Sequence, residues 1–253
     1  MEPFKLTGKI AIITGGNRGI GFAITRSLAS AGAAVVIANR NAEEGRMAAA
    51  QLEQEGLQAK AFQTDVASRS AVADLVARVL DNFDRIDILV NSAGVIERGP
   101  VENFTEAQWD GIMDINLKGL FFCCQAVGRE MIKRRKGKII NISSNVCDVV
   151  QPGRVVYAAS KAGVSHLTRG LALEWAPYNI NVNAIGPGPT LTELNQKFFE
   201  DNPTDLKMRI DSIPMGRLGT PVDHAGAAVF LASDASDFVT GQTLLIDGGS
   251  NLW

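Results

Sequence analysis

Short, continuous apolar runs recur along the chain and alternate with stretches whose apolar residues have helical spacing. The runs occupy residues 10–13, 34–38, 60–63, 86–90, 138–142, 180–185 and 241–246. Strands that are apolar throughout, separated by helices of about ten to fifteen residues, are typical of parallel strands buried on both faces. The pattern therefore predicts an α/β protein with a doubly wound parallel sheet and helices on both faces.

Capping residues mark the starts of several expected helices. Asn41 fits the N-cap of a helix that has Glu44 at the capping-box position and ends at Gly56. Ser68 and Thr105 fit the same N-cap position in two further helices. These signals place helices between the apolar runs, as a doubly wound sheet requires.

The alternation continues along the whole chain without an internal repeat, a low-complexity segment or a linker. We therefore expect residues 1–253 to form a single domain. Residues 191–212 break the pattern, because they are more polar, hold Pro203 and carry the adjacent aromatic residues Phe198 and Phe199. This segment is predicted to be an insertion of one or two short helices that covers the substrate cleft.

Composition narrows the class of protein. The chain is 46% hydrophobic and 21% charged, with a net charge of −2, which gives no sign of a nucleic-acid or membrane partner. No apolar run reaches the roughly 18 residues of a membrane span, and we expect no signal peptide. Cys123, Cys124 and Cys147 form no C-x-x-C pair, which predicts a cytoplasmic protein without structural disulfides or a metal site.

A glycine-rich turn directly follows the first apolar run. Gly15, Gly19 and Gly21 are spaced G-x-x-x-G-x-G, with Asn17, Arg18 and Ile20 between them. Glycines between a strand and a helix let the backbone approach a pyrophosphate at the helix N-terminus. The turn therefore predicts a dinucleotide site, and an ordinary strand-to-helix turn is the alternative.

The end of the second apolar run indicates which dinucleotide is bound. An acidic residue that binds the ribose 2′-hydroxyl is usual there, but this chain has Asn39 and then Arg40. A guanidinium pairs with a 2′-phosphate, and Arg18 is a second candidate cation. We predict NADP(H) over NAD(H), with NAD(H) as the alternative if Arg40 is only a solvated loop residue.

Other strand ends are expected to line the same cofactor site. Asp65 follows the third run, where an adenine ring would lie, although a helix-capping role is the alternative for this residue. Small residues after the fourth run let the cofactor lie close to the sheet, and a Pro-Gly-Pro-Thr sequence follows a later run. The predicted positions are Asp65, Val66, Asn91, Ala93, Gly94, Pro187, Gly188, Thr190 and Thr192.

Candidate catalytic groups cluster between residues 141 and 161. Tyr157 and Lys161 are four residues apart in a helix predicted over 157–175, so they share one face. Ser144 leaves the preceding strand, and a strand–loop–helix passage can return its hydroxyl to the phenol; the adjacent Ser143 is the alternative. His166 and His224 lie in helical segments remote from a strand end, where a structural or surface role is expected.

Together these motifs resemble the short-chain dehydrogenase/reductase family. The resemblance runs from Lys9 to Gly249 and rests on T-G-x-x-x-G-I-G at 14–21, N-S-A-G at 91–94, Asn116, Ser144, Y-x-x-x-K at 157–161 and Pro187-Gly188. It implies a Rossmann-type fold, a nicotinamide cofactor and a Ser-Tyr-Lys-Asn active site. Ser92 and Gly186 depart from the usual family residues, and both bear on cofactor fit.

The family resemblance assigns a role to each catalytic group. Tyr157, which would also contact the cofactor, is the proton donor in reduction, Ser144 binds the substrate oxygen, and Lys161 holds the nicotinamide ribose. Asn116 takes the place of a helix-kink residue in a proton relay. A free phenol has a pKa of about 10, and lowering it by about 3 units takes about 4 kcal/mol. A positive charge at about 4 Å supplies roughly that much, so Lys161 is expected to do most of it.

The substrate is left open between two branches of the family. The pattern resembles both the 3-oxoacyl-carrier-protein reductases and the gluconate-type sugar-acid dehydrogenases. An NAD(H)-dependent sugar-acid or polyol dehydrogenase is one alternative, and a nucleotide-binding regulator without turnover is another. Family members are commonly tetramers, so we expect a homotetramer to which residues 250–253 contribute.

Overall fold

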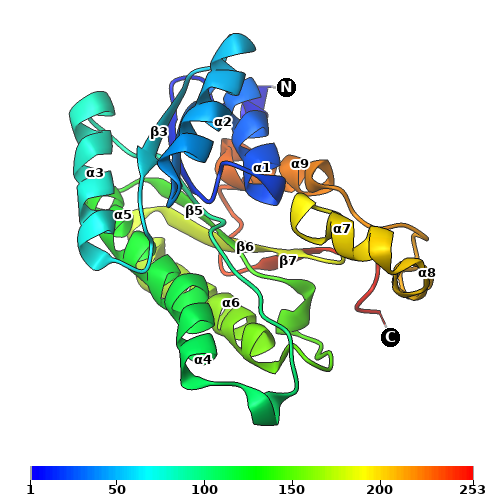
Figure 1. Ribbon diagram of the computed structural model, residues 1–253. Coiled ribbons are helices and arrows are strands. Elements are labelled where there is room, and N and C mark those ends of the chain that lie inside the picture. The colour runs from blue at the N-terminus through cyan, green and yellow to red at the C-terminus, as the bar shows by residue number, and fades with distance from the viewer. Residues whose placement is uncertain (1, 253) are drawn as a thin grey trace.

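A computed structural model describes residues 2–252 of the protein (Figure 1). Its centre is one parallel sheet of seven strands in the order β3-β2-β1-β4-β5-β6-β7. The strands are β1 (Ile10–Thr14), β2 (Ala34–Asn39), β3 (Ala59–Gln63), β4 (Ile88–Asn91), β5 (Gly137–Ile142), β6 (Ile180–Pro187) and β7 (Thr243–Ile246). The predicted doubly wound fold is confirmed, and the strand order reverses between β1 and β4.

Two layers of helices cover the sheet. The helices are α1 (Gly19–Ser30), α2 (Ala42–Gln54), α3 (Arg69–Phe83), α4 (Glu106–Met113), α5 (Leu120–Arg134), α6 (Val155–Trp175), α7 (Glu193–Asp201), α8 (Pro203–Asp211) and α9 (Ala225–Ala232). α1, α2 and α9 pack on one face, and α3, α5 and α6 pack on the other (Figure 1). None of the helices within residues 2–252 has the length and apolarity needed to span a membrane.

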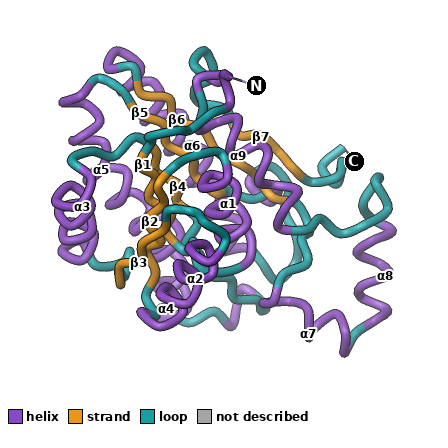
Figure 2. Tube along the Cα trace, turned by 90° about the horizontal axis from the view of Figure 1, so that it is seen from above, coloured by secondary structure: helices purple, strands orange, loops and turns teal. Residues whose placement is uncertain are grey.

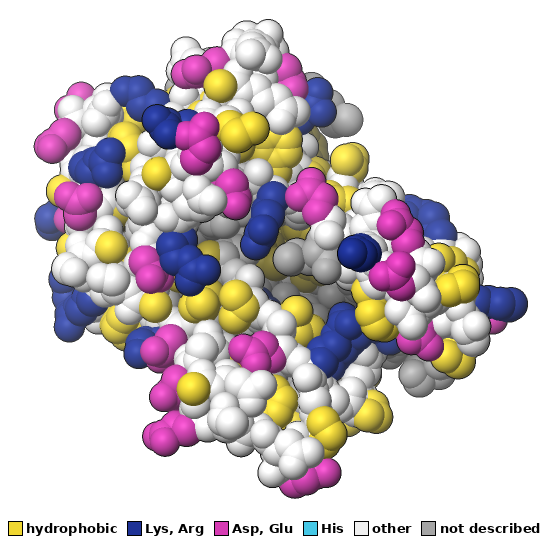
Figure 3. Space-filling model, viewed as in Figure 1, with side chains coloured by type: hydrophobic (Ala, Val, Ile, Leu, Met, Phe, Trp, Pro, Cys, Tyr) yellow, Lys and Arg dark blue, Asp and Glu magenta, His cyan; other side chains and the backbone are white. Residues whose placement is uncertain are grey.

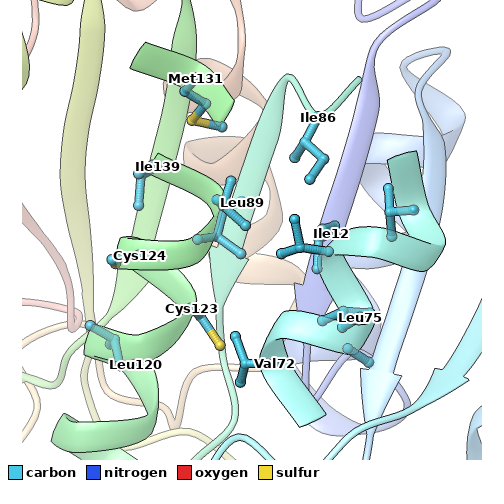
Figure 4. Packing of buried hydrophobic residues seen from close by; sticks show 14 of the residues in the cluster. Ile12, Val72, Leu75, Ile86, Leu89, Leu120, Cys123, Cys124, Met131 and Ile139 are labelled. Atoms are coloured by element: carbon cyan, nitrogen blue, oxygen red, sulfur yellow. The ribbon is translucent and has the colours of Figure 1, made fainter. Parts of the chain in front are cut away.

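Alternating strand residues supply the two halves of the core. Ile12 of β1 and Leu89 of β4 face α3 and α5, where they meet Leu75 and Cys123 (Figure 4). Ala11 and Ile13, which flank Ile12 in β1, face the opposite helical layer. Every residue of the five central strands is buried, which is why their sequences are mostly apolar.

Predicted caps begin the helices where expected. The Asn41 side chain accepts from the backbone N–H groups of Glu43 (3.0 Å) and Glu44 (3.4 Å). Ser68 caps α3, and Thr105 forms a capping box with Gln108 at the start of α4. These side chains satisfy donors that the first helical turn leaves unpaired.

The segment predicted as an insertion folds into two short helices, α7 and α8. They stand outside the two helical layers, to one side of the sheet (Figures 1 and 2). The aromatic rings of Phe198 and Phe199 meet edge to face, 5.5 Å between centroids.

Candidate active site

A cavity of about 970 Å³ opens at the carboxyl ends of the strands. Most of the residues predicted to bind the cofactor line it: Gly15, Asn17, Arg18, Gly19, Ile20, Asn39, Arg40, Asp65, Val66, Ala93, Gly94, Pro187, Gly188, Thr190 and Thr192. Ser144, Tyr157 and Lys161 line it as well. Figure 3 shows basic side chains around the hollow between the body and the outlying helices. In open α/β sheets ligands bind at this edge, where the strand order reverses.

The glycine turn between β1 and α1 is built without room for side chains. Gly15 has a φ of +65°, and a Cβ there would lie 2.9 Å from the Cα of Ala93. A Cβ at Gly21 would lie 2.1 Å from the carbonyl oxygen of Gly15. The turn therefore packs tightly against the loop after β4 and exposes its backbone to the cavity, as a bound pyrophosphate requires.

Cations without partners mark the end of the cavity beside β2. Arg18 and Arg40 are exposed, and no residue in the described part of the chain forms an ion pair with either guanidinium. Asn39 is buried and donates to the carbonyl oxygen of Asn41 (2.5 Å), which leaves its Oδ1 without a partner within residues 2–252. This end of the cavity therefore suits a phosphate better than a ribose hydroxyl that seeks a carboxylate.

Glu44, which was predicted only as a capping-box residue, also reaches this end of the cavity. Glu44 accepts hydrogen bonds from the side-chain amides of Asn17 (2.8 Å) and Asn41 (3.0 Å). Its two oxygens are thus turned to neutral donors. Its charge nevertheless lies in the lining that Arg18 and Arg40 share.

Ser144 and Tyr157 meet at the carboxyl end of β5. The Ser144 hydroxyl donates to Asn145 Oδ1 (3.4 Å) and accepts from the backbone N–H of Val146 (3.4 Å), and it is close enough to the phenol to lower the pKa of Tyr157. Ser143 points elsewhere, because its hydroxyl donates to the carbonyl oxygen of Lys161 (2.9 Å). Both serines line the cavity, but Ser144 is the one that acts on the phenol.

Burial and the neighbouring groups act in opposite directions on the pKa of the phenol. Burial raises the pKa of Tyr157, whereas the nearby Ser144 hydroxyl and the positive charges of Arg154 and Arg98 lower it, and burial dominates. Burial also lowers the pKa of Lys161 to about 8. The expectation that Lys161 brings the phenol toward neutrality is wrong for the protein alone, since its ammonium donates to the carbonyl oxygen of Ile142 (2.7 Å).

Asn116 lies at an irregularity in the helix but not in the cavity lining. A π-helix spans Asp114–Gly119 between α4 and α5, which agrees with the kink that the family resemblance implied. The buried Asn116 amide accepts from the backbone N–H of Val95 (2.8 Å) and donates to its carbonyl oxygen (2.9 Å) and to Ser160 Oγ (3.1 Å). The side chain thus holds the loop after β4 against α6.

Asn91 differs from its prediction as a cofactor ligand. Its side chain is buried beneath the cavity rather than in the lining, and donates to Asn141 Oδ1 (2.9 Å) and Cys124 Sγ (3.2 Å). Its successors Ser92, Ala93 and Gly94 reach the cavity instead. A polar residue at a strand end does not by itself show which way the side chain points.

Both departures from the family pattern have a local packing reason. A Cβ at Gly186 would lie 2.6 Å from a methyl carbon of Leu245, so that side chain already fills the space. The Ser92 hydroxyl lies 3.0 Å from the place where a Cβ at Gly21 would be. Both residues are therefore fitted to their neighbours in this chain.

The histidines have the structural and surface roles expected of them. His166 is exposed, whereas His224 is buried and its Nε2 lies 2.9 Å from Thr190 Oγ1. Because the Thr190 hydroxyl donates to the carbonyl oxygen of Gly188 (3.0 Å), the histidine Nε2–H is the donor to Thr190. His224 thus supports a cavity-lining residue from behind.

Three arginines gather at the substrate end of the cavity, on segments that were expected to line the substrate pocket. Arg98, Arg154 and Arg209 all line it, with Phe198 and Phe199 of α7. Arg98 and Arg154 lie in loops whose charges are usually solvated, and nothing in the local pattern singles out Arg209. Only the fold brings the three together.

Comparison with known proteins places the chain in a family. Residues 15–251 match the family model described as Enoyl-(Acyl carrier protein) reductase. The chain belongs to the short-chain dehydrogenase/reductase family. Within it, the chain is 42% identical to the gluconate 5-dehydrogenase of Gluconobacter oxydans, over 97% of this chain and 96% of that protein.

Other family members differ in their named activities. The NAD-dependent glycerol dehydrogenase of Listeria innocua is 41% identical, over 98% of this chain and 96% of that protein. The 3-oxoacyl-[acyl-carrier-protein] reductase of Chlamydia pneumoniae is 41% identical, over 96% of this chain and 97% of that protein. A crystal structure of a gluconate 5-dehydrogenase from Burkholderia cenocepacia, in complex with NADP and tartrate, matches with a TM-score of 0.95 and 42% identity, over 99% of this chain and 98% of that chain.

Proposed function

We propose that the protein interconverts a carbonyl and a secondary alcohol by NADP(H)-dependent hydride transfer, with a small polar substrate of the sugar-acid or polyol kind. The observation that carries this proposal is the placement of Ser144 beside Tyr157 in the cavity that Arg18 and Arg40 also line. Relatives named for gluconate and glycerol, and the relative crystallised with NADP and tartrate, support the same reaction.

Tyr157 supplies the proton in the proposed mechanism. The bound nicotinamide would supply the hydride, and the negative charge that then develops on the carbonyl oxygen needs a proton donor and a hydrogen bond. A phenol whose pKa is raised by burial is protonated at neutral pH, which is the form that reduction needs. The Ser144 hydroxyl, which lines the same cavity beside the phenol, would hold the substrate oxygen.

The other predicted residues would hold the cofactor. The glycine turn from Gly15 to Gly21 would receive the pyrophosphate, and Arg18 and Arg40 the 2′-phosphate. Lys161 would hold the ribose beside the nicotinamide, and that contact would draw its ammonium away from Ile142. Asn116 acts indirectly, because it positions the loop after β4.

Helices α7 and α8 are proposed to cover the substrate. Phe198 and Phe199 of α7 and Arg209 of α8 reach the cavity lining from outside the two helical layers. Their side chains would exclude water from the reacting oxygen once substrate is bound. The insertion of residues 191–212 would thus be the part of the single domain that covers the substrate.

A screen with NADPH tests the proposed reaction. Oxidation of NADPH should be followed with 5-ketogluconate, dihydroxyacetone and an acetoacetyl thioester, and repeated with NADH. We expect turnover of the first two, with NADPH preferred. Turnover confined to the thioester would instead favour the carrier-protein branch, and no NADPH oxidation with any of the three would contradict the proposal.

We also propose a cytoplasmic homotetramer. Leu173, on the outer face of α6, is 80% exposed, and Phe121 and Trp109 are also exposed, so apolar surface is available for subunit contacts. The three cysteines are free thiols, as is usual in a reducing compartment. Ser250 and Asn251 contact Asn145 of their own chain, and Trp253 lies outside the described residues. Light scattering that gives a monomer would remove the tetramer.

A further inference from the structure

Three elements bring positive charge to the substrate end of the cavity. Arg98 comes from the loop after β4, Arg154 is the N-cap residue of α6, and Arg209 belongs to α8. They are close enough to disturb one another. Burial, together with the charges of Arg209 and Arg98, lowers the pKa of Arg154 to about 10, and the pKa of Arg209 is lowered in the same way by burial and Arg98.

None of the three arginines forms an ion pair within residues 2–252. Arg209 donates to the neutral Gln151 Oε1 (2.9 Å), and the Arg98 guanidinium lies over the Phe198 ring, 5.6 Å from its centroid. The surface arginine Arg26, by contrast, has a carboxylate partner in Glu55. Like charges gathered without a counter-ion oppose folding, so their presence beside the catalytic groups calls for an anionic ligand.

Two of the three acidic residues in the lining lie elsewhere. Asp65 follows β3 and Glu44 belongs to α2, which places both toward the β3 end of the sheet. The third, Glu193, is at the start of α7. The cluster is also next to the reacting groups, because the charges of Arg154 and Arg98 act on the Tyr157 phenol. A ligand held by these arginines therefore lies within reach of Tyr157.

We propose that Arg98, Arg154 and Arg209 bind the carboxylate of a hydroxy-acid substrate while its secondary alcohol meets Ser144 and Tyr157. The proposal rests on the proposed function and selects the anionic substrates over the neutral polyols. Planar guanidinium groups pair with a carboxylate through two parallel hydrogen bonds. Because Arg209 belongs to α8 and Arg154 to α6, the same carboxylate also ties the covering helices to the body.

Gluconate and sorbitol form a matched pair of probes, since they differ only in the carboxylate or hydroxymethyl group at C1. With NADP⁺, we expect kcat/KM for gluconate to exceed that for sorbitol by about 10- to 100-fold, the usual range for hydrogen bonds to a charged group. Equal values, or a preference for sorbitol, would overturn the proposal. Sorbitol 6-phosphate is a third probe, and a preference for it over gluconate would overturn the carboxylate assignment in favour of a phosphate ester.

Variants test the individual arginines. In Arg154→Gln and Arg209→Gln, the ratio of kcat/KM for gluconate to that for sorbitol should fall about tenfold, mainly through the KM for gluconate. Arg26→Gln removes an arginine that is paired at the surface, and should leave both values unchanged. A loss of the same size for both substrates in the cavity variants would contradict carboxylate binding.

Thermal unfolding gives a readout that does not depend on turnover. Without ligand, Arg154→Gln should melt at or above the wild-type temperature, because one of three mutually repelling charges is gone. Gluconate with NADP⁺ should raise the melting temperature of the wild type more than sorbitol does, and this difference should shrink in the variant. A variant that melts lower and keeps the wild-type response to gluconate would assign Arg154 a purely structural role.

The two proposals fail in distinguishable ways. If the protein oxidises sorbitol and gluconate equally well with NADP⁺, the proposed hydride transfer is supported and the three arginines do not bind the carboxylate. If no carbonyl or alcohol is turned over but gluconate still stabilises the wild type through Arg154, the anion site stands and the proposed reaction falls.

Discussion

The ammonium nitrogen of Lys161 lies 5.8 Å from the centroid of the Tyr157 ring and is hydrogen-bonded to a backbone carbonyl instead of the phenol. The two residues share a face of α6, as their spacing predicts, yet the lysine is not among the groups that lower the pKa of the tyrosine. In the protein without cofactor, Tyr157 is therefore a protonated acid and not an activated base.

This relationship predicts how Tyr157 ionises. Because burial raises its pKa, the phenol should ionise above the ordinary value of about 10 in the free protein. The chain has 2 tyrosines, so the ultraviolet absorbance of tyrosinate in the wild type, minus that in Tyr157→Phe, isolates this titration. Addition of NADP⁺ should move it to lower pH.

Lys161→Met serves as the control for that titration. It should leave the ionisation of Tyr157 in the free protein nearly unchanged, since the ammonium is turned to Ile142. Ionisation near neutral pH in the free wild type, shifted upward by Lys161→Met, would instead restore the direct role of the lysine that its helical spacing suggested.

Cofactor choice should depend on Arg40. In Arg40→Ala, the KM for NADPH should rise about 10- to 100-fold while the KM for NADH changes little, because only NADPH has the 2′-phosphate that the guanidinium would bind. Arg46→Ala is a matched control, since Arg46 is also exposed and near the start of α2 but pairs with Glu43. Steady-state kinetics with both cofactors measures the effect.

The carboxylate of Glu44 allows a second test of the predicted preference for NADPH. Glu44→Gln removes the negative charge and keeps one of the two acceptor oxygens that Asn17 and Asn41 use, and should strengthen NADPH binding. A wild type that prefers NADH, or an Arg40→Ala variant that loses both cofactors equally, would overturn the assignment of this end of the cavity to a 2′-phosphate.

Acid should destabilise the protein through His224. Burial lowers the pKa of His224 to about 4, from an ordinary value of about 6.5. Between these values the unfolded chain binds a proton that the folded protein refuses, so the free energy of unfolding falls as the pH drops from about 6.5 to 4, by at most about 3 kcal/mol. Denaturant unfolding at several pH values measures this loss.

The variant His224→Gln isolates that contribution from the contribution of the carboxylates. Its amide can still donate to Thr190, but it has no proton to gain, so stability should depend less steeply on pH in this window. An identical pH dependence in both proteins would show that His224 is protonated in the folded state without cost.

Two glycines should respond oppositely to alanine. Gly21→Ala places a methyl group 2.1 Å from the carbonyl oxygen of Gly15, so it should cost about 1–3 kcal/mol of stability and weaken NADPH binding. Gly170→Ala, inside α6, meets nothing within 4 Å and should stabilise by up to about 1 kcal/mol. Thermal unfolding compares them, and a stable Gly21→Ala variant with normal NADPH affinity would contradict the tight turn.

The strands could be predicted because burial on both faces leaves them few polar residues. The first and last residues of the strands could be predicted less accurately, because an apolar residue indicates burial and does not indicate pairing in the sheet. Ile86 was expected to begin the fourth strand, yet it is a core residue just before β4, which starts at Ile88. The intervening Asp87 turns its carboxylate to Arg85 and Arg134.

Site residues could be predicted where one element presents them, and were missed where several elements meet. The face shared by Tyr157 and Lys161 follows from helical geometry, and the glycine turn from its place after a strand. The partner of Lys161 depends on which carbonyl of β5 lies opposite. The convergence of Arg98, Arg154 and Arg209 depends on where α8 returns to the body, and local sequence carries no signal for either.

Turnover and NADPH binding in Tyr157→Phe, measured side by side, test the central claim that this phenol exchanges the proton with substrate. Replacing the hydroxyl removes the acid and keeps the ring, so NADPH affinity by fluorescence titration should stay within about twofold while kcat falls about 10²- to 10⁴-fold, the usual contribution of general acid catalysis. Wild-type turnover in a variant that still binds NADPH would contradict the account.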